Sequence, residues 1–555
     1  MFLNEWLNKL SVSLTTDVTA FAPELILCAG IVIMLLMRLF RALDRIHLGT
    51  AALTVVILAL LANFVQNVDT SADTWREWKA VDRQAVDLFG GMLVYDNFMI
   101  FMRYVLLGFT ALTIWLSLLT GIPDREDSAD FYCLLLGATL GMSLMASANH
   151  LLMVYIAVEM ASLPSYALAG FLKGKRQSSE AALKYVVYGG GASGIMLYGI
   201  SLLAGKFGTA YLPDLAQCFA TIFKSAPQGG AVGLDPMVML GTLFILIGIG
   251  FKLAAFPFHF WCPDVFEGAS AEVAAFLSVA SKAAALALLA RFSLELAGWG
   301  IGSIPDGATT RRIAYYFGPA LGVFAALTAT FGNLAAYYQT NLKRLLAYST
   351  ISQAGYMMMG LTTFTADGAG AVLFYLVGYL FMNLGAFAIV AFLRNQTGSE
   401  DLSSFRGIVR QSPLLVVTLA FFLFSLVGVP PLVGFAAKFQ IFSVLFNAGN
   451  QYVAHYPMLA YTMYALLVIG GINTVISLVY YLNVLKVMVL EKPADEKVPT
   501  WSIPFGWSCF AGLMAAAVLV LGIFWNPLAE SSKKGAAPFG SRLKPAGSVT
   551  RSPGG

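Results

Sequence analysis

Residues 245–288 read ILIGIGFKLAAFPFHFWCPDVFEGASAEVAAFLSVASKAAALAL. A long apolar run contains Lys252 and stops at Pro257, and a polar segment with His259 follows. A second apolar run then contains Lys282 near its middle. A charged side chain near the centre of a bilayer costs at least ~2.5–3.5 kcal/mol. Lysines and a proline break inside segments of membrane-spanning length therefore indicate an ion or proton pathway.

The composition is that of an all-α protein with many membrane-spanning helices. Of the 555 residues, 58% are hydrophobic and 12% are charged, and the mean hydropathy is +0.75. Soluble proteins have roughly 25% charged residues. The net charge of +4 is too small to argue for nucleic-acid binding. The five cysteines have neither metal-ligand spacing nor a pairing framework, so we interpret them as buried apolar residues.

The apolar runs predict fourteen spans of about 17–25 residues, the length that a ~30 Å hydrocarbon core requires. The twelfth is too long for one straight helix and contains Gly428, Pro430, Pro431 and Gly434. We expect it to break there, with the freed carbonyls facing protein or an internal water pocket. The predicted spans are 20–39, 48–66, 97–120, 131–147, 149–170, 181–203, 237–258, 271–293, 317–337, 344–362, 370–393, 413–445, 459–487 and 504–525.

The seventh and twelfth spans share a proline break and a lysine, Lys252 in one and Lys438 in the other. Because they lie five spans apart, they predict two repeats of five helices in opposite orientation. Matching broken helices in two repeats point to a transport site. The predicted divisions are 1–129 (helices 1–3), 130–293 (first repeat), 317–489 (second repeat), 490–529 (helix 14) and 530–555 (a basic, disordered tail).

The loop charges predict the orientation. Lysines and arginines gather in the loops of one side, with Lys343 and Arg394 among them, and that side is expected to be cytoplasmic. Both termini then face outward, with Arg291 counted in an outer loop. Residues 1–21 lack the basic region and apolar core of a cleaved signal, so we expect a surface segment or a short polar lead-in. The bacterial inner membrane is the expected location.

Two further charges lie inside predicted spans. Glu159 is in the middle of the fifth span and Lys184 is in the sixth, so we expect them to form an ion pair. Such a pair either takes part in proton transfer or only holds two helices together. Lys184 and Lys252 lie near helix ends, where snorkelling toward the interface is an alternative. Lys282 and Lys438 lie too far from helix ends for that explanation.

Lysine suits proton transfer because burial disfavours its charged form and a nearby carboxylate or water restores it. His259 either relays protons between Lys252 and Lys282 or caps the broken helix. Lys438 is expected to be the only buried lysine of the second repeat and to release protons outward.

Four segments together resemble the antiporter-like membrane subunits of respiratory complex I, the NADH:quinone oxidoreductase. They are KLAAFPFHFWCPDVFEGA (252–269), AAFLSVASKAAALALLAR (274–291), NLKRLLAYSTISQAGYMMMG (341–360) and VGVPPLVGFAAKFQIF (427–442). The resemblance extends over residues 20–525 and implies fourteen helices, two inverted five-helix repeats and proton translocation. It places the family's buried glutamate and lysines on Glu159, Lys184, Lys252, Lys282 and Lys438.

The resemblance also implies what surrounds the chain. It implies no cofactor in this chain, with NADH, FMN, iron–sulfur clusters and quinone expected in partner subunits. The expected partners are other antiporter-like and small membrane subunits and the lipid bilayer, with no nucleic acid. The sequence agrees with redox chemistry elsewhere, because it has no cysteine cluster and no glycine-rich strand-to-helix motif.

The chain departs from the family pattern at three places. Ser270-Ala271-Glu272 stands where the family often has Pro-Thr-Pro, and Gln353 stands where it often has a histidine. Spans nine to thirteen have no counterpart of Glu159, which makes the two repeats chemically unequal. Glu272 either suits a helix N-terminus or exchanges protons with the lysines.

Two other classes of function stay open at the level of sequence. One is a subunit of a cation/proton antiporter complex or of a membrane-bound hydrogenase with the same fold. The other is an integral membrane enzyme such as a lipid-linked sugar transferase, which needs an acidic cluster for a metal ion. Its only candidate is the group Asp124, Glu126, Asp127 and Asp130, which also fits a solvated loop.

Overall fold

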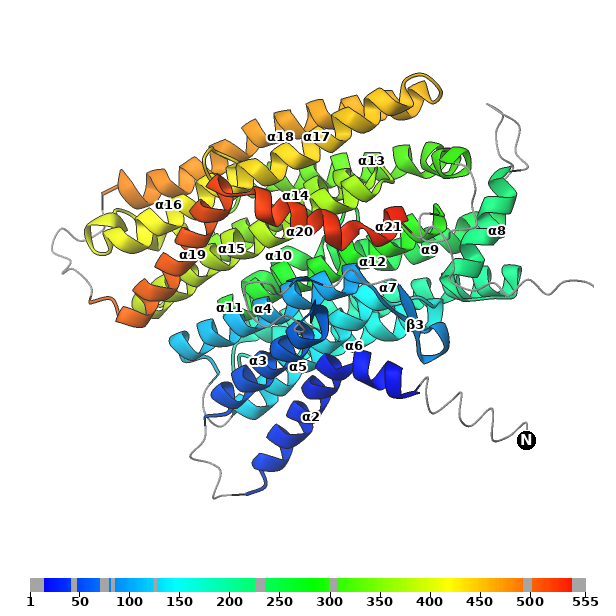
Figure 1. Cartoon of the computed structure of the whole chain (residues 1–555). Coiled ribbons are helices and arrows are strands. Elements are labelled where there is room, and N and C mark those ends of the chain that lie inside the picture. The colour runs from blue at the N-terminus through cyan, green and yellow to red at the C-terminus, as the bar shows by residue number, and fades with distance from the viewer. Residues whose placement is uncertain are drawn as a thin grey trace, which may run out of the picture.

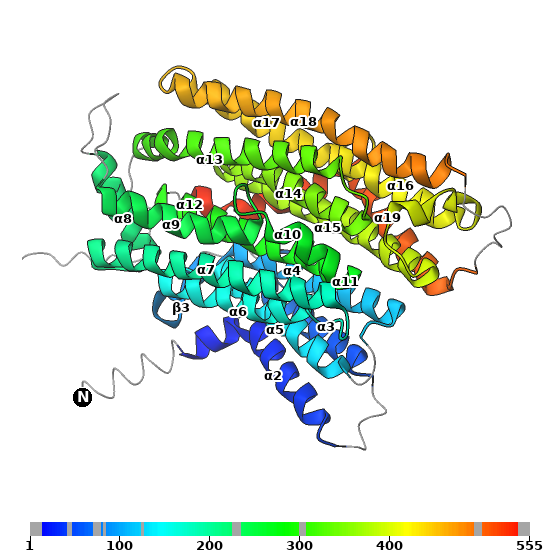
Figure 2. The ribbon, with the colours of Figure 1, turned by 180° about the vertical axis from the view of Figure 1, so that it is seen from behind.

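The computed structural model describes residues 14–40, 47–69, 79–80, 85–123, 127–224, 235–298, 307–492 and 502–541. Figures 1 and 2 show long helices side by side, with α2 at one edge of the molecule, α17 and α18 at the opposite edge, and the C-terminal helix α20 back in the middle. A helix at Leu14–Ala20 precedes α2 at an angle of 71°. The other helices are α2 (Ala22–Met37), α3 (Leu48–Asn67), α4 (Asn97–Thr120), α5 (Ser128–Ser147), α6 (Leu151–Ala169), α7 (Arg176–Phe207), α8 (Leu212–Lys224), α9 (Pro236–Leu253), α10 (Trp261–Gly268), α11 (Ala271–Phe276), α12 (Lys282–Leu296), α13 (Gly307–Ala336), α14 (Leu342–Leu361), α15 (Ala366–Thr397), α16 (Pro413–Val427), α17 (Val433–Tyr452), α18 (Pro457–Val489), α19 (Phe505–Ile523), α20 (Asn526–Ala536) and α21 (Pro538–Ser541).

The all-α membrane fold is confirmed, but the count of fourteen spans is not. Among the described residues, 11 helices are long and apolar enough to cross a membrane, or 12 with the bent N-terminal pair. Each predicted span does contain a helix. The difference comes from α14, which is more polar, and from the second broken span, whose first half, α16, has only 15 residues.

Polar side chains cap the N-termini of α4 and α6, and short strands fill the connection between α3 and α4. Asp96 accepts a hydrogen bond from the Met99 backbone at 2.9 Å and thereby caps α4. His150 caps α6 through Nδ1, which accepts from the Leu152 backbone at 3.2 Å. Between α3 and α4 lie two short antiparallel strand pairs, which are β1 (Val68–Asp69) with β2 (Lys79–Ala80) and β3 (Val86–Leu88) with β4 (Leu93–Tyr95).

Both predicted helix breaks are confirmed. The first follows α9, where Ala254 has a φ of 55°, and turns lead to the short helix α10. The second follows α16, where Gly428 has a φ of 97°, a conformation that favours glycine. The sequence did not predict a further irregularity, a π-helical turn at Leu277–Ser281 that leads directly into α12.

The two predicted repeats meet along buried helices. Within an apolar stretch of 18 residues in each span, all residues are buried in Ala271–Leu296 and 89% are buried in α15, whereas only 33% are buried in α18. Helix α14 packs against α10, and α15 packs against α11. Lys282 is therefore surrounded by protein side chains and not by lipid.

The C-terminal segment corrects the prediction of disorder from residue 530 onward. Helices α20 and α21, shown in red in Figure 1, lie across α15, and α20 also contacts α4. Phe539 is fully buried and its ring lies 4.9 Å from that of Phe98. Residues 542–555 lie outside the described part of the chain.

Candidate functional site

Lys252 lies at the first helix break and its side chain points into the protein. The residue is 1% exposed. Its Nζ donates a hydrogen bond to Ser162 Oγ of α6 at 2.9 Å and lies 5.9 Å from the centre of the Tyr185 ring of α7. This internal contact is not the one that snorkelling toward the interface predicts. The ammonium also interacts electrostatically with Glu159 and Lys282.

Glu159 and Lys184 do not form the expected ion pair. Lys184 Nζ pairs with Glu180 at 2.8 Å and with Asp264 at 2.7 Å, and its side chain is 37% exposed. Glu159 Oε1 is buried and has no hydrogen-bond partner among the described residues. Glu159 and Ser162 lie three positions apart on α6, and residues at that spacing are neighbours on a helix surface. Glu159 therefore belongs with Lys252 and not with Lys184.

Lys282 lies in the fully buried span, directly after the π-helical turn. Its Nζ lies 3.8 Å from Cys262 Sγ, its hydrogen-bond acceptor. It also lies 5.7 Å from the Trp261 ring and 5.2 Å from the Phe266 ring. All three contacts come from α10, so the half-helix after the first break encloses this lysine.

His259 has mainly aromatic neighbours. Its ring centre lies 4.4 Å from that of Phe260 and 4.4 Å from that of Phe331. Its Nδ1 is buried and has no hydrogen-bond partner in the described chain. The contacts of His259 in the described chain include neither Lys252 nor Lys282, so the relay role of His259 stays a prediction.

Lys438 lies at the second helix break. Its Nζ donates to the backbone carbonyl of Val427 at 2.9 Å and lies 4.3 Å from the centre of the Tyr356 ring. Gln353 Nε2 donates to the neighbouring carbonyl of Leu426 at 3.1 Å. The sequence predicted that these freed carbonyls face protein or an internal water pocket, and in the structure side chains of the protein bind both carbonyls directly.

Lys438 is not the only buried lysine of the second repeat. Lys343, predicted to lie in a cytoplasmic loop, is 2% exposed and pairs with Glu400 at 2.8 Å. Arg291, predicted in an outer loop, is fully buried and binds Asp96 through both terminal nitrogens at 3.0 Å. The loop charges did not predict that Lys343 and Arg291 are buried, because their partners come from distant segments of the chain.

A buried polar group lies between Lys282 and the second break. Ser278 Oγ lies 2.9 Å from Thr350 Oγ1 and 3.0 Å from the Tyr379 hydroxyl. One turn further along α14, Gln353 accepts a hydrogen bond from Tyr375. The sequence did not predict this group as a link between the repeats, although the polar residues at helical spacing in α14 indicate a polar face on that helix.

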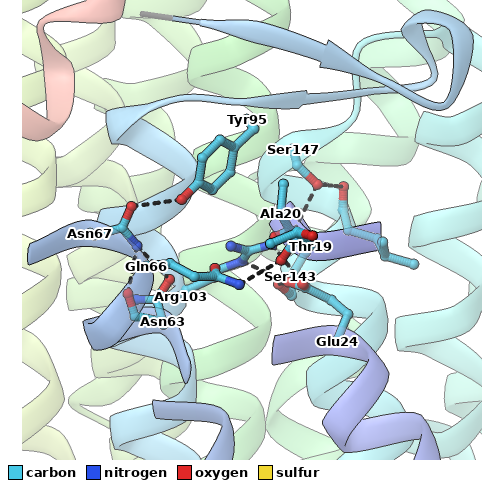
Figure 3. Close-up of polar contacts among 11 residues, drawn as sticks. Thr19, Ala20, Glu24, Asn63, Gln66, Asn67, Tyr95, Arg103, Ser143 and Ser147 are labelled. Carbon is cyan, nitrogen blue, oxygen red and sulfur yellow. Dashed lines mark hydrogen bonds and ion pairs between the residues drawn. The ribbon is translucent and has the colours of Figure 1, made fainter. Parts of the chain in front are cut away.

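A buried ion pair near the N-terminus was also missed. Figure 3 shows Arg103 of α4 pointing at Glu24 of α2, with distances of 2.9 Å from Nε to Oε1 and 2.6 Å from Nη2 to Oε2. Ser143 of α5 donates to the same carboxylate at 2.5 Å. Both ionic side chains are 1% exposed. The available signal was Glu24, a glutamate in the first turn of an apolar helix.

The described residues contain no group of three or more His, Cys, Asp or Glu side chains that could hold a metal ion. Asp127 pairs with Lys173 at 2.6 Å, and Asp130 pairs with Arg38 at 2.7 Å. These acidic residues thus form separate pairs, as in a solvated loop. Asp124 and Glu126 lie outside the described residues.

Comparisons with known proteins agree with this architecture. Residues 148–463 match the family model described as NADH:quinone oxidoreductase/Mrp antiporter, TM. The chain is 41% identical over 513 residues to NADH-quinone oxidoreductase subunit N of Anaeromyxobacter sp. (strain Fw109-5), covering 92% of this chain and 94% of that protein. A chain of respiratory complex I from Thermus thermophilus with bound aureothin superposes with a TM-score of 0.68 at 30% identity, over 92% of this chain and 98% of that one.

A chain of the Mrp complex from Dietzia sp. DQ12-45-1b superposes with a TM-score of 0.74 over 94% of this chain and 97% of that one, but at 20% identity this likeness shows the fold alone. The helix breaks and the matched model define an antiporter-like membrane protein of many spans. Within that class, the chain belongs to the NADH-quinone oxidoreductase subunit N family.

Proposed function

We propose that this chain is a proton-translocating membrane subunit of an NADH:quinone oxidoreductase. One observation supports the proposal most. Lys252, Lys282 and Lys438 are almost fully buried, and their hydrogen-bond acceptors are neutral: a hydroxyl, a thiol and a backbone carbonyl. Burial disfavours the charged form of such a lysine, and proton loss breaks no hydrogen bond to a carboxylate.

Lys184 differs from these three lysines in a way that supports the same assignment. It contacts two carboxylates and is more than a third exposed, so its charge is held in place. In the proposed function Lys184 and Glu159 couple the chain to a neighbouring subunit. The three buried lysines, with neutral acceptors, carry the proton.

The proposed route follows the buried side chains. Lys252 is loaded from the cytoplasmic side, and Lys282 receives the proton next, with His259 as a proposed relay. Ser278 and Thr350 lead from there toward Gln353 and the second break. Lys438 then releases the proton outward. This direction requires the predicted orientation in the bacterial inner membrane, with both termini outside.

The energy for this transfer must come from partner subunits. Moving one proton against 100 mV costs ~2.3 kcal/mol. We propose that NADH, FMN, iron–sulfur clusters and quinone act in those subunits, so that this chain is part of a translocating oxidoreductase without holding a redox group. Partners that purify with the chain in mild detergent test this assignment. Recovery of antiporter subunits alone would contradict it.

The relay is tested at Lys438 in the assembled complex in vesicles. Lys438→Ala should lower the number of protons moved per electron, or the turnover if the two are strictly coupled, because no other lysine at the second break can hold the proton. Lys486→Ala, at an exposed position at the end of α18, is the matched control and should change neither. An unchanged ratio and turnover in Lys438→Ala would remove this residue from the route.

A further inference from the structure

Four charged side chains meet where the two repeats pack together, outside the proposed route. Arg394 Nη2 of α15 lies 3.3 Å from Glu272 Oε1 of α11. Lys343 Nζ of α14 lies 2.8 Å from Glu400 Oε2 and donates to the carbonyl of Ala269 at 2.6 Å. Ala269 is three residues before Glu272, so the two ion pairs adjoin the same turn of chain.

Each ion pair of the cluster joins a deeply buried side chain to a more exposed one. Glu400 and Arg394 have side chains that are 16% and 12% exposed, whereas Lys343 is 3% exposed and Glu272 is 0% exposed. Under the predicted orientation, the more exposed side chains lie toward the cytoplasm. The cluster therefore connects a water-accessible edge with a fully buried carboxylate.

Glu272 is incompletely satisfied as an anion. Its Oε2 is buried and has no hydrogen-bond partner among the described residues, and Oε1 has a single contact at 3.3 Å. A buried carboxylate oxygen without a donor is costly, and protonation removes the negative charge. The start of α11 and Arg394 favour the anion in return. One oxygen of Glu272 thus contacts Arg394, and the other lies buried without a donor among the described residues.

The groups that face this carboxylate are few. Arg394 is its ion-pair partner, Lys343 interacts with it electrostatically, and Tyr132 of α5 does so as well. Glu400 pairs with Lys343 and balances its charge. Lys343 thus pairs with the Glu400 carboxylate and also interacts electrostatically with the Glu272 carboxylate.

We infer that Glu272 takes up protons from the cytoplasmic side for the lysine route and that Lys343 controls their release. Water at the edge formed by Arg394 and Glu400 gives a proton to the Glu272 carboxylate. Lys343 then shifts its contact from Glu400 toward Glu272, which favours the anion and releases the proton inward. This inference rests on the proposed function and adds the place where protons enter the chain.

The receiving groups lie further along the same helix. Glu272 and Lys282 are separated by about 15 Å along the axis at the usual rise per residue. The π-helical turn between them contains Ser278, which joins the buried polar group, and Ser281, whose hydroxyl has no hydrogen-bond partner in the described chain. The hydroxyls of Ser278 and Ser281 provide proton carriers between Glu272 and Lys282.

The test is Glu272→Gln in the assembled complex, reconstituted in vesicles with controlled pH on each side. The number of protons moved per electron should fall as far as it does in Lys438→Ala, and the loss should grow as the pH on the cytoplasmic side rises. Glu272→Asp should keep part of the ratio, since the carboxylate survives. Glu491→Gln, which alters the exposed pair with Arg406, should behave as the unmodified protein.

The outcomes separate this inference from the proposed function. A normal ratio in Glu272→Gln with a lowered ratio in Lys438→Ala would overturn the inference alone, whereas normal ratios in both would overturn the proposed function too. A purely structural ion pair predicts a loss that is independent of pH. If Glu272→Gln does not assemble, Glu272→Gln combined with Arg394→Gln removes both charges, and the same pH-dependent loss is expected.

Discussion

At the residue scale, Lys252, Lys282 and Lys438 are almost fully buried beside neutral hydrogen-bond acceptors, whereas Lys343, which the sequence placed in a loop, is buried against Glu400. Lys252, Lys282 and Lys438 were identified because a charge inside an apolar run is conspicuous. The partner of Lys184 was wrong, because Asp264 comes from a distant segment that folds back beside α7. Residue spacing along one helix predicts which side chains of that helix are neighbours. Contacts between helices depend on how the helices pack, which cannot be read from a single sequence.

Lys252 provides a test of charge switching at a single residue. Lys252→Met and Lys252→Arg should both impair proton transport, because methionine binds no proton and arginine stays charged in the working pH range. The ratio of protons to electrons in reconstituted vesicles measures the effect. Lys206→Arg, at a partly exposed lysine that pairs with Asp235, is the control and should retain activity. Full activity in Lys252→Arg would mean that only the positive charge matters.

At the element scale, local chemistry predicted the two breaks well. Proline and glycine impose their backbone preferences wherever they stand, so α9 and α16 end close to the predicted places. The π-helical turn at Leu277–Ser281 has no such marker, since its residues are ordinary helix or strand formers. It arises in a span that is completely enclosed by protein, so packing and not local preference accounts for it.

Buried charge pairs between elements provide a stability prediction. Glu24→Gln should destabilise the packing of α2 on α4 by ~3–5 kcal/mol, because it leaves the Arg103 guanidinium buried without its counter-charge. Adding Arg103→Gln should recover part of that loss. Thermal unfolding of the purified complex measures both changes, provided that the N-terminal helices unfold within the observed transition.

The matched control for this pair is Arg38 with Asp130, which joins the C-terminal end of α2 to α5 and is about half exposed. Asp130→Asn should cost no more than ~1 kcal/mol, as exposed ion pairs do. Equal effects of Glu24→Gln and Asp130→Asn would show that burial does not strengthen the contribution of the Glu24–Arg103 pair.

At the scale of the whole molecule, the sequence predicted the class of fold and both helix breaks from hydropathy and from the places of proline and glycine, and the two repeats stay a prediction. It failed at the C-terminus, where small and basic residues are typical of disorder. The structure instead contains α20 and α21, packed across α15 and α4. A short helix of this composition is marginal by itself and owes its stability to the surface on which it packs. Only the assembled fold provides that surface.

Phe539 tests how the C-terminal segment is held against the rest of the protein. Its buried ring lies against Phe98 and 5.8 Å from the Arg291 guanidinium, so it covers the buried pair between Arg291 and Asp96. Phe539→Ala should cost roughly 3–5 kcal/mol of packing at this site. Because α21 is short, the loss should appear as faster proteolysis within residues 526–541 and as a lower unfolding temperature. Phe505→Ala, at an 86% exposed position, should change neither. If Phe539→Ala is cleaved no faster than Phe505→Ala, the C-terminal helices are held by α20 alone, through its contacts with α15 and α4.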